Sequence, residues 1–379
     1  MKIAYIKRSR CNAGGTEKVV FNKTNYLIDK GYDVTLITSE HKDKPDFFPF
    51  SNKLKRIDLE INYSDLANKS FFAKICLRIY KNLIHRRRLK SVLLKERFDI
   101  VVSMYGDEMY WITDINDGSK KLLETHFSRF YRVKFLKKKE NLISRGIIKL
   151  RDNKDLKALK KFDRFIVLSN EDAPDWGIVP NIKTIYNGIS IPANSAKLDS
   201  KIAVAVGRLT YQKGFDMLID AWSIVHKTHP DWRLNIYGEG GDKHQLQAQI
   251  SRLNLDDVVI LTDPTPKIYD RMAESSIYLM TSRHEGFGLV LAEAMSCGVP
   301  AVSFACKCGP RDIINDGKDG FLVEQDDITT FADRVCKLIE DEDLRKEMGA
   351  NARKRIEGHF SEEVVMKQWE ELFEELINK

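Results

Sequence analysis

Short apolar runs alternate with longer amphipathic segments throughout the first half of the chain. Residues 3–6 form the first such run, and Val20, Leu27 and Ile28 then recur at helical spacing. Runs rich in β-branched and aromatic residues, bounded by turn-forming residues, are typical of buried strands. The pattern predicts a helix that begins at residues 14–17 and strands at residues 3–6, 33–38, 99–103, 120–124 and 164–169.

The second half repeats this rhythm more regularly. Each apolar run is followed by a helix-like or short capped segment. Strands that alternate with helices along a sequence form parallel sheets, and the helices cover both faces of those sheets. The predicted fold class is therefore α/β, with doubly wound parallel sheets. The strands predicted in this half are residues 202–206, 233–237, 258–261, 277–280, 301–304 and 320–323.

The length of the chain predicts two domains. With 379 residues it exceeds the roughly 150 residues of one ordinary domain, and residues 191–200 are small and polar, as in a linker. We therefore expect an N-terminal domain at 1–192 and a C-terminal domain at 200–358. Residues 361–379 carry Trp369 and Phe373 at helical spacing, and we expect this last helix to return to the first domain.

No segment of the sequence predicts a membrane span or a disulfide framework. The first eight residues lack the apolar run of a secretion signal, and no stretch approaches the roughly 18 apolar residues that cross a bilayer. We therefore expect a cytoplasmic protein. Of six cysteines only Cys306 and Cys308 lie close in sequence, without further ligands beside them, so we expect reduced thiols and no metal site.

Basic residues are concentrated in the first half. The net charge is +7, but residues 69–97 carry ten Lys or Arg against one acid, and residues 129–161 carry thirteen against three. In 70–97 and 129–150, apolar residues are interleaved with these cations, as in helices that lie on anionic membranes. We expect contact with the inner face of the cell membrane. A solvated helix face is the main alternative, and nucleic-acid binding, for which no module is recognisable, is disfavoured.

The strongest chemical signal lies at residues 282–300, after one predicted strand and at the start of a helix. Gly286 and Gly288 let the backbone approach a ligand, and free N–H groups at a helix start receive phosphate oxygens. Glu285 and Glu293 flank that position, and carboxylates beside a phosphate suit the neutral hydroxyls of a sugar and a ribose. A capped helix start with one surface glutamate is the alternative.

A second signal, residues 207–214, directly follows the predicted strand at 202–206. It places Arg208 and Lys213 on a loop at the carboxyl end of a parallel strand, where doubly wound sheets bind ligands. A forked guanidinium and a compact ammonium suit a diphosphate. The alternative is a pair of solvated surface charges.

Five motifs, in order along nearly the whole chain, resemble glycosyltransferase family 4. The resemblance implies the GT-B fold, in which two Rossmann-like domains face each other across a deep cleft. It also points to the branch of enzymes that act on bacterial polysaccharides and lipid-linked oligosaccharides. The motifs are residues 12–17 (NAGGTE), 124–126 (ETH), 186–189 (YNGI), 207–214 (GRLTYQKG) and 285–300 (EGFGLVLAEAMSCGVP).

The resemblance also implies roles for single residues. Arg208 and Lys213 would hold the diphosphate and neutralise the leaving group, without a metal ion or other cofactor. Glu285, with the amides of Gly286, Phe287 and Gly288, would hold the transferred sugar, while Leu289 helps to hold the phosphate. Glu293 would accept hydrogen bonds from the ribose. The remaining implied contacts are His126 with the sugar, Gly14 and Gly15 with the acceptor, and Gly238, Gly240 and the 263–267 loop around Pro266 with the base.

The implied reaction moves a hexose or N-acetylhexosamine from a UDP-sugar to a saccharide acceptor, with retention of configuration. The acceptor expected is lipid-linked, on a polyprenyl diphosphate. The departing phosphate would itself accept the acceptor's proton, so no covalent nucleophile is assigned. A nucleotide-sugar epimerase or hydrolase of the same fold, and a catalytically silent nucleotide-sugar-binding partner, are the alternative functions.

Two further patterns resemble known functional motifs but do not predict those functions here. Residues 341–343 (DED) fit the acid-x-acid pattern of metal-dependent transferases, but they lie between two amphipathic segments and predict a turn and a helix start. Gly238 and Gly240 belong to only a fragment of the dinucleotide fingerprint, so a nicotinamide enzyme is disfavoured.

Overall fold

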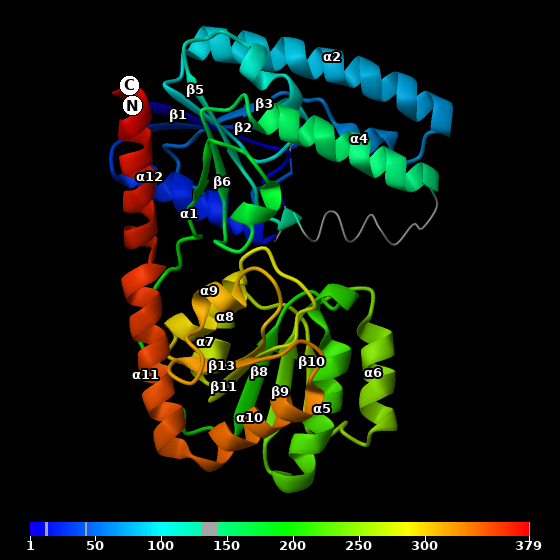
Figure 1. Cartoon of the computed structure of the whole chain (residues 1–379), viewed down its shortest axis with the longest axis vertical. Helices are drawn as coiled ribbons and strands as arrows, with labels where there is room; N and C mark the ends of the chain where they lie inside the picture. The colour runs from blue at the N-terminus through cyan, green and yellow to red at the C-terminus, as the bar shows by residue number, and fades with distance from the viewer. Residues whose placement is uncertain (12–13, 42–43, 130–141, 379) are drawn as a thin grey trace. The chain divides into compact units, whose positions relative to one another are not determined.

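The computed structural model describes residues 1–11, 14–41, 44–129 and 142–378. Contacts divide the chain into two compact units. Unit 1 comprises residues 1–168, 172–188 and 366–379, and unit 2 comprises residues 169–171 and 189–365. Each unit is a parallel sheet with helices packed on it (Figure 1).

Unit 1 contains a seven-stranded parallel sheet in the order β3-β2-β1-β4-β5-β6-β7. Its central strands are apolar on both faces, and Ile3, Ala4 and Tyr5 of β1 are completely buried. The strands are β1 (Lys2–Lys7), β2 (Asp33–Thr38), β3 (Lys55–Asp58), β4 (Ile100–Ser103), β5 (Lys120–Glu124), β6 (Arg164–Val167) and β7 (Ile182–Thr184). Its helices are α1 (Gly15–Asp29), α2 (Phe71–Glu96), α4 (Leu142–Leu159) and most of α12 (Glu362–Ile377).

Unit 2 contains a six-stranded parallel sheet in the order β10-β9-β8-β11-β12-β13. Its strands are β8 (Ile202–Val206), β9 (Arg233–Tyr237), β10 (Val259–Thr262), β11 (Ile277–Met280), β12 (Ala301–Phe304) and β13 (Gly320–Val323). Its helices are α5 (Phe215–Thr228), α6 (Lys243–Arg252), α7 (Ile268–Ala273), α8 (Leu289–Ser296), α9 (Pro310–Ile313), α10 (Ile328–Glu340) and α11 (Glu342–His359). Trp222 and Phe331 are among the largest side chains of its core.

The two Rossmann-like α/β folds predicted from the sequence are confirmed, and the predicted strands agree with the observed ones to within two residues at each end. The pattern missed two strands, β3 and β7. Both lie at the edges of the first sheet, and neither contains a fully buried residue. Edge strands of this kind lack the apolar run by which the central strands were recognised.

The chain enters unit 2 earlier than the linker composition indicates. The Ile189 N–H donates to the carbonyl of Phe360, and the Glu362 N–H donates to the carbonyl of Ile189. This bridge fixes the chain to unit 2 at residue 189, whereas the sequence placed the boundary at 192–200. Helix α12 begins in unit 2 and belongs to unit 1 from Met366 onward.

Candidate active site

The two loops with the strongest motifs meet in unit 2. They follow β8 and β11, which are adjacent parallel strands, so both loops leave the same edge of the sheet. The Lys213 ammonium lies 2.7 Å from the Glu285 carboxylate, although the two residues are 72 positions apart. Both side chains are largely buried. The structure therefore brings together two residues that the sequence assigned to one site.

Several contacts lock these two loops together. The Arg283 N–H donates to the carbonyl of Gln212, and the Gln212 side chain donates to the carbonyl of His284. Arg283 also forms two hydrogen bonds with the Asp216 carboxylate, at 2.9 and 2.5 Å. Arg283 and Asp216 were not predicted from the sequence, because nothing in it shows which acid an arginine reaches.

Gly214 is required by this close approach. Its φ is +64°, and a Cβ at this position would overlap the carbonyl oxygen of Thr281. A side chain here would therefore be strained and would separate the two loops. The Thr281 hydroxyl donates to the carbonyl of Gly214 at 2.9 Å. This hydrogen bond helps to keep the neighbouring Lys213 close to Glu285.

The Glu285 carboxyl is ionised. Its burial opposes ionisation, but the Lys213 ammonium outweighs that effect, and the pKa of Glu285 lies below its usual value. An ammonium has three donors, so Lys213 retains donors beyond the one it gives to Glu285. The pair thus presents a carboxylate for hydroxyl groups beside a cation for anionic oxygens.

Arg208 and the start of α8 complete the cationic side of this site. The Arg208 guanidinium donates to the Gln212 side chain at 3.0 Å and belongs to the same loop as Lys213. Helix α8 starts after Gly288, whose φ is +91°, and its first N–H groups have no acceptors one turn earlier. These groups are donors of the kind that bind anions at helix starts.

Glu293 lies on α8 and is 5% exposed. The Tyr269 hydroxyl donates to its carboxylate, and burial followed by the charge of Glu293 raises the pKa of Tyr269. Tyr269 thereby restricts the orientation of Glu293, a contact that the sequence did not indicate.

The predicted base-binding glycines pack against the loop after β8. A Cβ at Gly238 would overlap the carbonyl oxygen of Gly207, and one at Gly240 would overlap that of Leu209. Both glycines are therefore needed for loop packing, whether or not a base binds beside them. Pro266 lies exposed in the turn between β10 and α7, two strands from β8 in the sheet.

One predicted residue of unit 1, His126, belongs to a buried group of charged side chains. Lys23 of α1 forms a buried ion pair with Glu124 at the end of β5, and the Lys23 ammonium lies 3.9 Å from the Trp369 ring of α12. His126 Nε2 is 3.1 Å from the Glu124 carboxylate. Burial lowers the pKa of His126 and outweighs the opposing effect of Glu124, so the imidazole is neutral near pH 7.

The glycine loop is only partly described, because residues 12 and 13 lie outside the described residues. Gly14 and Gly15 begin α1, and a Cβ at Gly14 would overlap the Glu17 carboxylate. Glu17 in turn lies 3.3 Å from Lys7 at the end of β1. Gly14 thus leaves room for a carboxylate in the first turn of α1.

The acid-x-acid pattern, the cysteines and the helices also bear on function, and Asp341 of the acid-x-acid pattern has a structural role. Asp341 caps α11, with its side chain accepting from the Leu344 N–H, as the predicted turn and helix start require. The six cysteines are free. Within the described ranges, no three His, Cys, Asp or Glu side chains come together as metal ligands. None of the described helices is both long and apolar enough to cross a bilayer.

Comparisons with known proteins identify the family of the chain. Residues 13–191 match the family model Glycosyltransferase Family 4, and residues 189–355 match Glycosyl transferases group 1. The amylovoran biosynthesis glycosyltransferase AmsD of Erwinia amylovora is 28% identical over 378 residues, covering 95% of this chain and 96% of AmsD.

Two solved structures have the same fold. Sucrose-phosphate synthase from Thermosynechococcus elongatus superposes with a TM-score of 0.82 at 20% identity, over 100% of this chain and 99% of that chain. The second is a point mutant of TarM of S. aureus, crystallised with UDP, fondaparinux and alpha-GlcNAc-glycerol. It superposes with a TM-score of 0.77 at 19% identity, over 98% of this chain and 99% of the TarM chain. Two matched models in succession, two Rossmann-like units and a full-length relative agree: the chain belongs to glycosyltransferase family 4, the GT-B glycosyltransferases.

Proposed function

We propose that this glycosyltransferase moves a hexose or N-acetylhexosamine from a UDP-sugar to a saccharide acceptor, with retention of configuration and without a metal ion. The observation that carries the proposal is the Lys213–Glu285 pair where two ligand-binding loops meet. It places a cation for a diphosphate directly beside a carboxylate for the hydroxyl groups of a sugar.

Charge develops on the diphosphate as the bond to the sugar breaks. Lys213, Arg208 and the N–H groups at Leu289 are fixed donors that stabilise such charge without reorganisation during the reaction. With cations in this position, the leaving group needs no divalent ion. The leaving phosphate then accepts the proton of the acceptor hydroxyl, and no protein side chain acts as a covalent nucleophile.

The carboxylates and glycines bind the other parts of the donor, which are the sugar, the ribose and the base. Glu285, with the amides of Gly286, Phe287 and Gly288, holds the sugar hydroxyls, and Glu293, oriented by Tyr269, holds the ribose hydroxyls. Gly238, Gly240 and Pro266 lie beside the base. His126, which is neutral, contributes a hydrogen bond to the sugar rather than a charge, and Gly14 and Gly15 contact the acceptor.

Relatives support the choice of donor and pathway. TarM was crystallised with UDP, and another relative, of Staphylococcus aureus and 32% identical over 62% of this chain, is a poly(ribitol-phosphate) alpha-N-acetylglucosaminyltransferase. AmsD acts in the biosynthesis of amylovoran. We therefore propose that this enzyme acts in the synthesis of a bacterial surface polysaccharide or glycan. Its proposed place at the inner face of the cell membrane depends on the basic segments of unit 1 and not on these relatives.

A thermal-shift panel of nucleotides tests the donor assignment. We expect UDP to raise the melting temperature by several degrees at 100 times its dissociation constant, because that excess stabilises by about 2.7 kcal/mol. The shift and the subsequent turnover should persist in excess EDTA. Stabilisation by another nucleotide but not by UDP would refute the UDP assignment, and loss of turnover in EDTA would refute the metal-free mechanism.

Acceptor dependence separates this function from its alternatives. A transferase releases UDP from the donor in proportion to acceptor, whereas an epimerase or hydrolase of the same fold processes the donor alone. A silent binding partner would show the thermal shift with no turnover under any condition.

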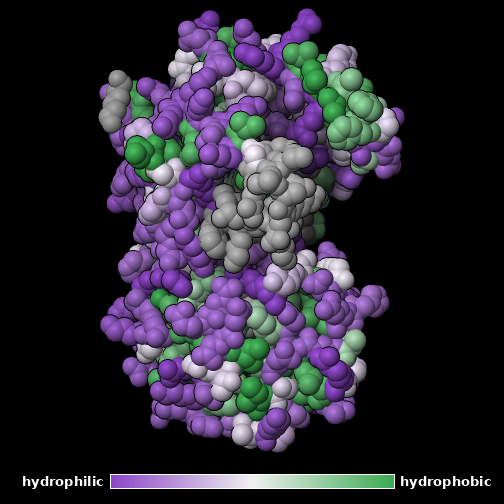
Figure 2. Space-filling model, turned by 45° about the vertical axis from the view of Figure 1, so that its right-hand side comes forward, coloured by the Kyte–Doolittle hydropathy of each residue, from purple (hydrophilic) through white to green (hydrophobic). Residues whose placement is uncertain are grey.

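We also propose that α2 contacts the surface of an anionic membrane. Its first half exposes large apolar side chains beside basic ones, and Figure 2 shows hydrophobic side chains gathered at the upper right, where α2 begins. The apolar side chains are Phe71, Phe72, Ile75, Ile79 and Leu83. In the second basic segment, 129–150, residues 130–141 lie outside the described residues, so the argument uses α2 alone.

Co-sedimentation with vesicles tests this membrane contact. We expect binding to vesicles that contain phosphatidylglycerol, loss of binding to pure phosphatidylcholine, and weakening with salt, because exposed charges are screened within about 10 Å at 0.1 M. Replacing Phe71 and Phe72 with serine should abolish binding. Ile178→Ser, which removes an 89% exposed apolar side chain of the same unit, is the matched control. Binding that survives the double substitution would contradict the proposal.

A further inference from the structure

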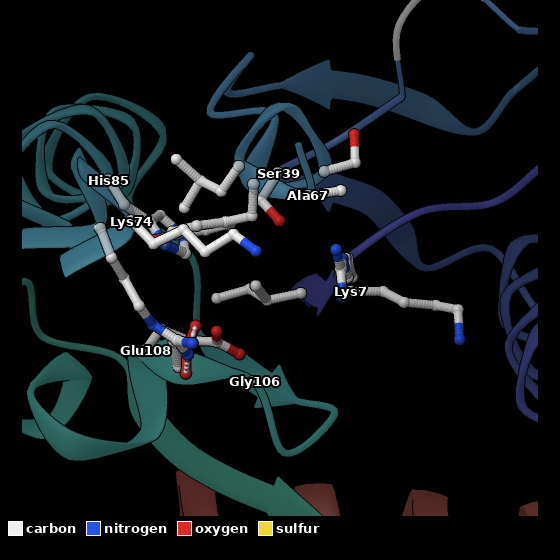
Figure 3. Close-up of a pocket in the computed structure, with 14 residues that line it drawn as sticks. Lys7, Ser39, Ala67, Lys74, His85, Gly106 and Glu108 are labelled. Atoms are coloured by element: carbon white, nitrogen blue, oxygen red, sulfur yellow. Dashed lines mark hydrogen bonds and ion pairs between the residues drawn. The ribbon is translucent and has the colours of Figure 1, made fainter. Parts of the chain in front are cut away.

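A cavity of about 380 Å³ lies within unit 1, apart from the residues considered so far except Lys7. It is enclosed by the carboxyl ends of β1, β2 and β4, the 3₁₀ turns Tyr63–Leu66 and Asp107–Tyr110, and residues 74–85 of α2 (Figure 3). Its volume is within the ordinary range for small-molecule sites, roughly 300–1,000 Å³. The lining residues are Ile6, Lys7, Arg8, Ser39, Tyr63, Ser64, Leu66, Ala67, Lys74, Arg78, His85, Gly106, Asp107 and Glu108.

Specific hydrogen bonds fix the walls of this cavity. Lys81 of α2 donates to the carbonyl oxygens of Ile61 and Asn62, both at 2.6 Å, and so fastens the helix to the segment that leads into the first 3₁₀ turn. The Tyr63 hydroxyl donates to the Asn82 side chain of α2 at 2.7 Å. These contacts hold α2 against the segment 61–63, which forms one wall of the cavity.

Glu108 presents a buried carboxylate to the cavity. The residue is 4% exposed, and its carboxylate accepts a hydrogen bond from the Ser103 hydroxyl at 2.7 Å. A Cβ at Gly106 would overlap this carboxylate, so the glycine makes room for it. Burial raises the pKa of Glu108, and no cation pairs with it within the described part of the chain. Whether ionised or protonated, the carboxyl group keeps an oxygen that can accept a hydrogen bond from a hydroxyl group.

His85 provides a second acceptor. It is 2% exposed, and its Nδ1 lies 3.1 Å from the Tyr63 hydroxyl. Because that hydroxyl donates to Asn82, Nδ1–H must donate to it, and Nε2 carries a lone pair. Burial lowers the pKa of His85 to about 4, so the ring is neutral at pH 7. Among the described residues Nε2 has no hydrogen-bond partner, although a buried polar atom ordinarily has one.

Three of the four cations that line the cavity already have carboxylate partners. Lys7 pairs with Glu17, and in Figure 3 its side chain points away from the other labelled side chains. Arg8 pairs with Glu40, and Arg78 pairs with Asp107. Lys74 is the exception, since no carboxylate in the described ranges lies within ion-pair distance of it. The cavity therefore combines acceptors for hydroxyl groups with one ammonium that remains available for an anion.

We infer that this cavity binds the acceptor of the transfer, and that the acceptor unit held there is an acidic saccharide: a sugar whose hydroxyl groups donate to Glu108 and His85 and whose phosphate or carboxylate pairs with Lys74. The inference rests on the proposed function, because it assigns an acceptor site to a transferase. It extends that function by naming a site within unit 1 and a class of acceptor. In this proposal Glu108 and His85 bind the acceptor, whereas the donor nucleotide is assigned to the loops of unit 2.

Calorimetric titration of the full chain tests the site. Saturating UDP is added first so that a sugar phosphate cannot occupy the donor site. The probes are N-acetylglucosamine 1-phosphate, N-acetylglucosamine and inorganic phosphate. We expect the phosphorylated sugar to bind with a millimolar dissociation constant, about tenfold more tightly than either of the other two, because only it satisfies both halves of the site.

Two variants assign the contacts. Lys74→Ala should reduce the affinity for the phosphorylated sugar about tenfold and leave that for the neutral sugar unchanged. Glu108→Gln, which keeps an acceptor for Ser103, should weaken both sugars about tenfold. Lys53→Ala removes an exposed lysine of the same unit outside the cavity and serves as the matched control. Lys74 is itself exposed, so its replacement tests the site even if Glu108→Gln fails to fold.

Three outcomes would overturn the inference. They are the absence of saturable binding of the phosphorylated sugar, equal binding of inorganic phosphate, and equal losses from Lys74→Ala and Lys53→Ala. Failure of the proposed function appears separately, as a lack of UDP binding in the first step of the same titration.

Discussion

Lys213→Ala is expected to lower kcat by two to three orders of magnitude. The ammonium lies beside Glu285 on the loop after β8, and removal of one fixed donor from a site where charge develops costs roughly 10²–10³ in rate. The loss should be in kcat more than in KM if Lys213 stabilises the leaving group rather than the bound donor. The measurement is steady-state release of UDP from the donor in the presence of acceptor.

Two comparisons make this result specific. Lys201→Ala removes a lysine that is 63% exposed just before β8, paired with Asp231, and should leave kcat unchanged. Glu285→Gln should lower kcat while UDP affinity is retained, because in the proposed donor complex the carboxylate holds the sugar and not the nucleotide. Unchanged turnover in Lys213→Ala would remove the leaving-group role. Melting temperatures of all three variants verify that each remains folded.

Lys23→Met is expected to destabilise unit 1 by about 3–5 kcal/mol at neutral pH, because removal of one partner leaves the other as an uncompensated buried charge. Lys23 is 3% exposed and Glu124 is completely buried, and the methionine preserves most of the side-chain volume. For a domain of about this size, such a loss corresponds to a fall of roughly 6–20 °C in melting temperature.

The pH dependence of this loss follows from the pKa of Glu124, which differs between the wild type and the variant. In the wild type, burial raises the pKa of Glu124 but Lys23 and His126 outweigh it and hold the pKa at about 2, so the pair contributes stability above pH 4.5 that is lost as the pH falls toward 2. In Lys23→Met, only the smaller effect of His126 opposes burial, so we expect the pKa of Glu124 to rise above its usual value. The variant then loses stability as the pH rises, and its deficit is largest near pH 7.

A double variant separates charge from packing. Lys23→Met with Glu124→Gln removes both charges and should recover more than half of the lost stability. Lys30→Ala, which removes an exposed lysine just beyond the end of α1, should change the melting temperature by less than about 2 °C. A single variant as stable as the wild type at pH 7 would show that the pair is not needed by the fold.

The apolar runs of the sequence determined the class of fold and the places of the central strands. A buried parallel strand must be apolar on both faces, so β1, β8 and β11 are visible in the sequence as continuous runs. The order of strands and loops then determined that Arg208, Lys213 and Glu285 follow the carboxyl ends of strands, whereas the structure showed that β8 and β11 are neighbours. Lys213 and Glu285 could be assigned to one site because each belongs to a loop typical of ligand binding and because both loops resemble motifs of one family.

The tertiary structure alone decided which distant side chains meet. Lys23 and Glu124 are 101 residues apart, Trp369 comes from the end of the chain, and no local pattern marks them as neighbours. The same holds for α2, where a periodic mixture of basic and apolar residues does not show that His85 and Lys74 line a cavity while Phe71 and Phe72 remain exposed. The periodicity of apolar residues depends on the local geometry of a helix or strand and can therefore be seen in the sequence. The pairing of charges and the enclosure of a cavity depend on how separate elements pack.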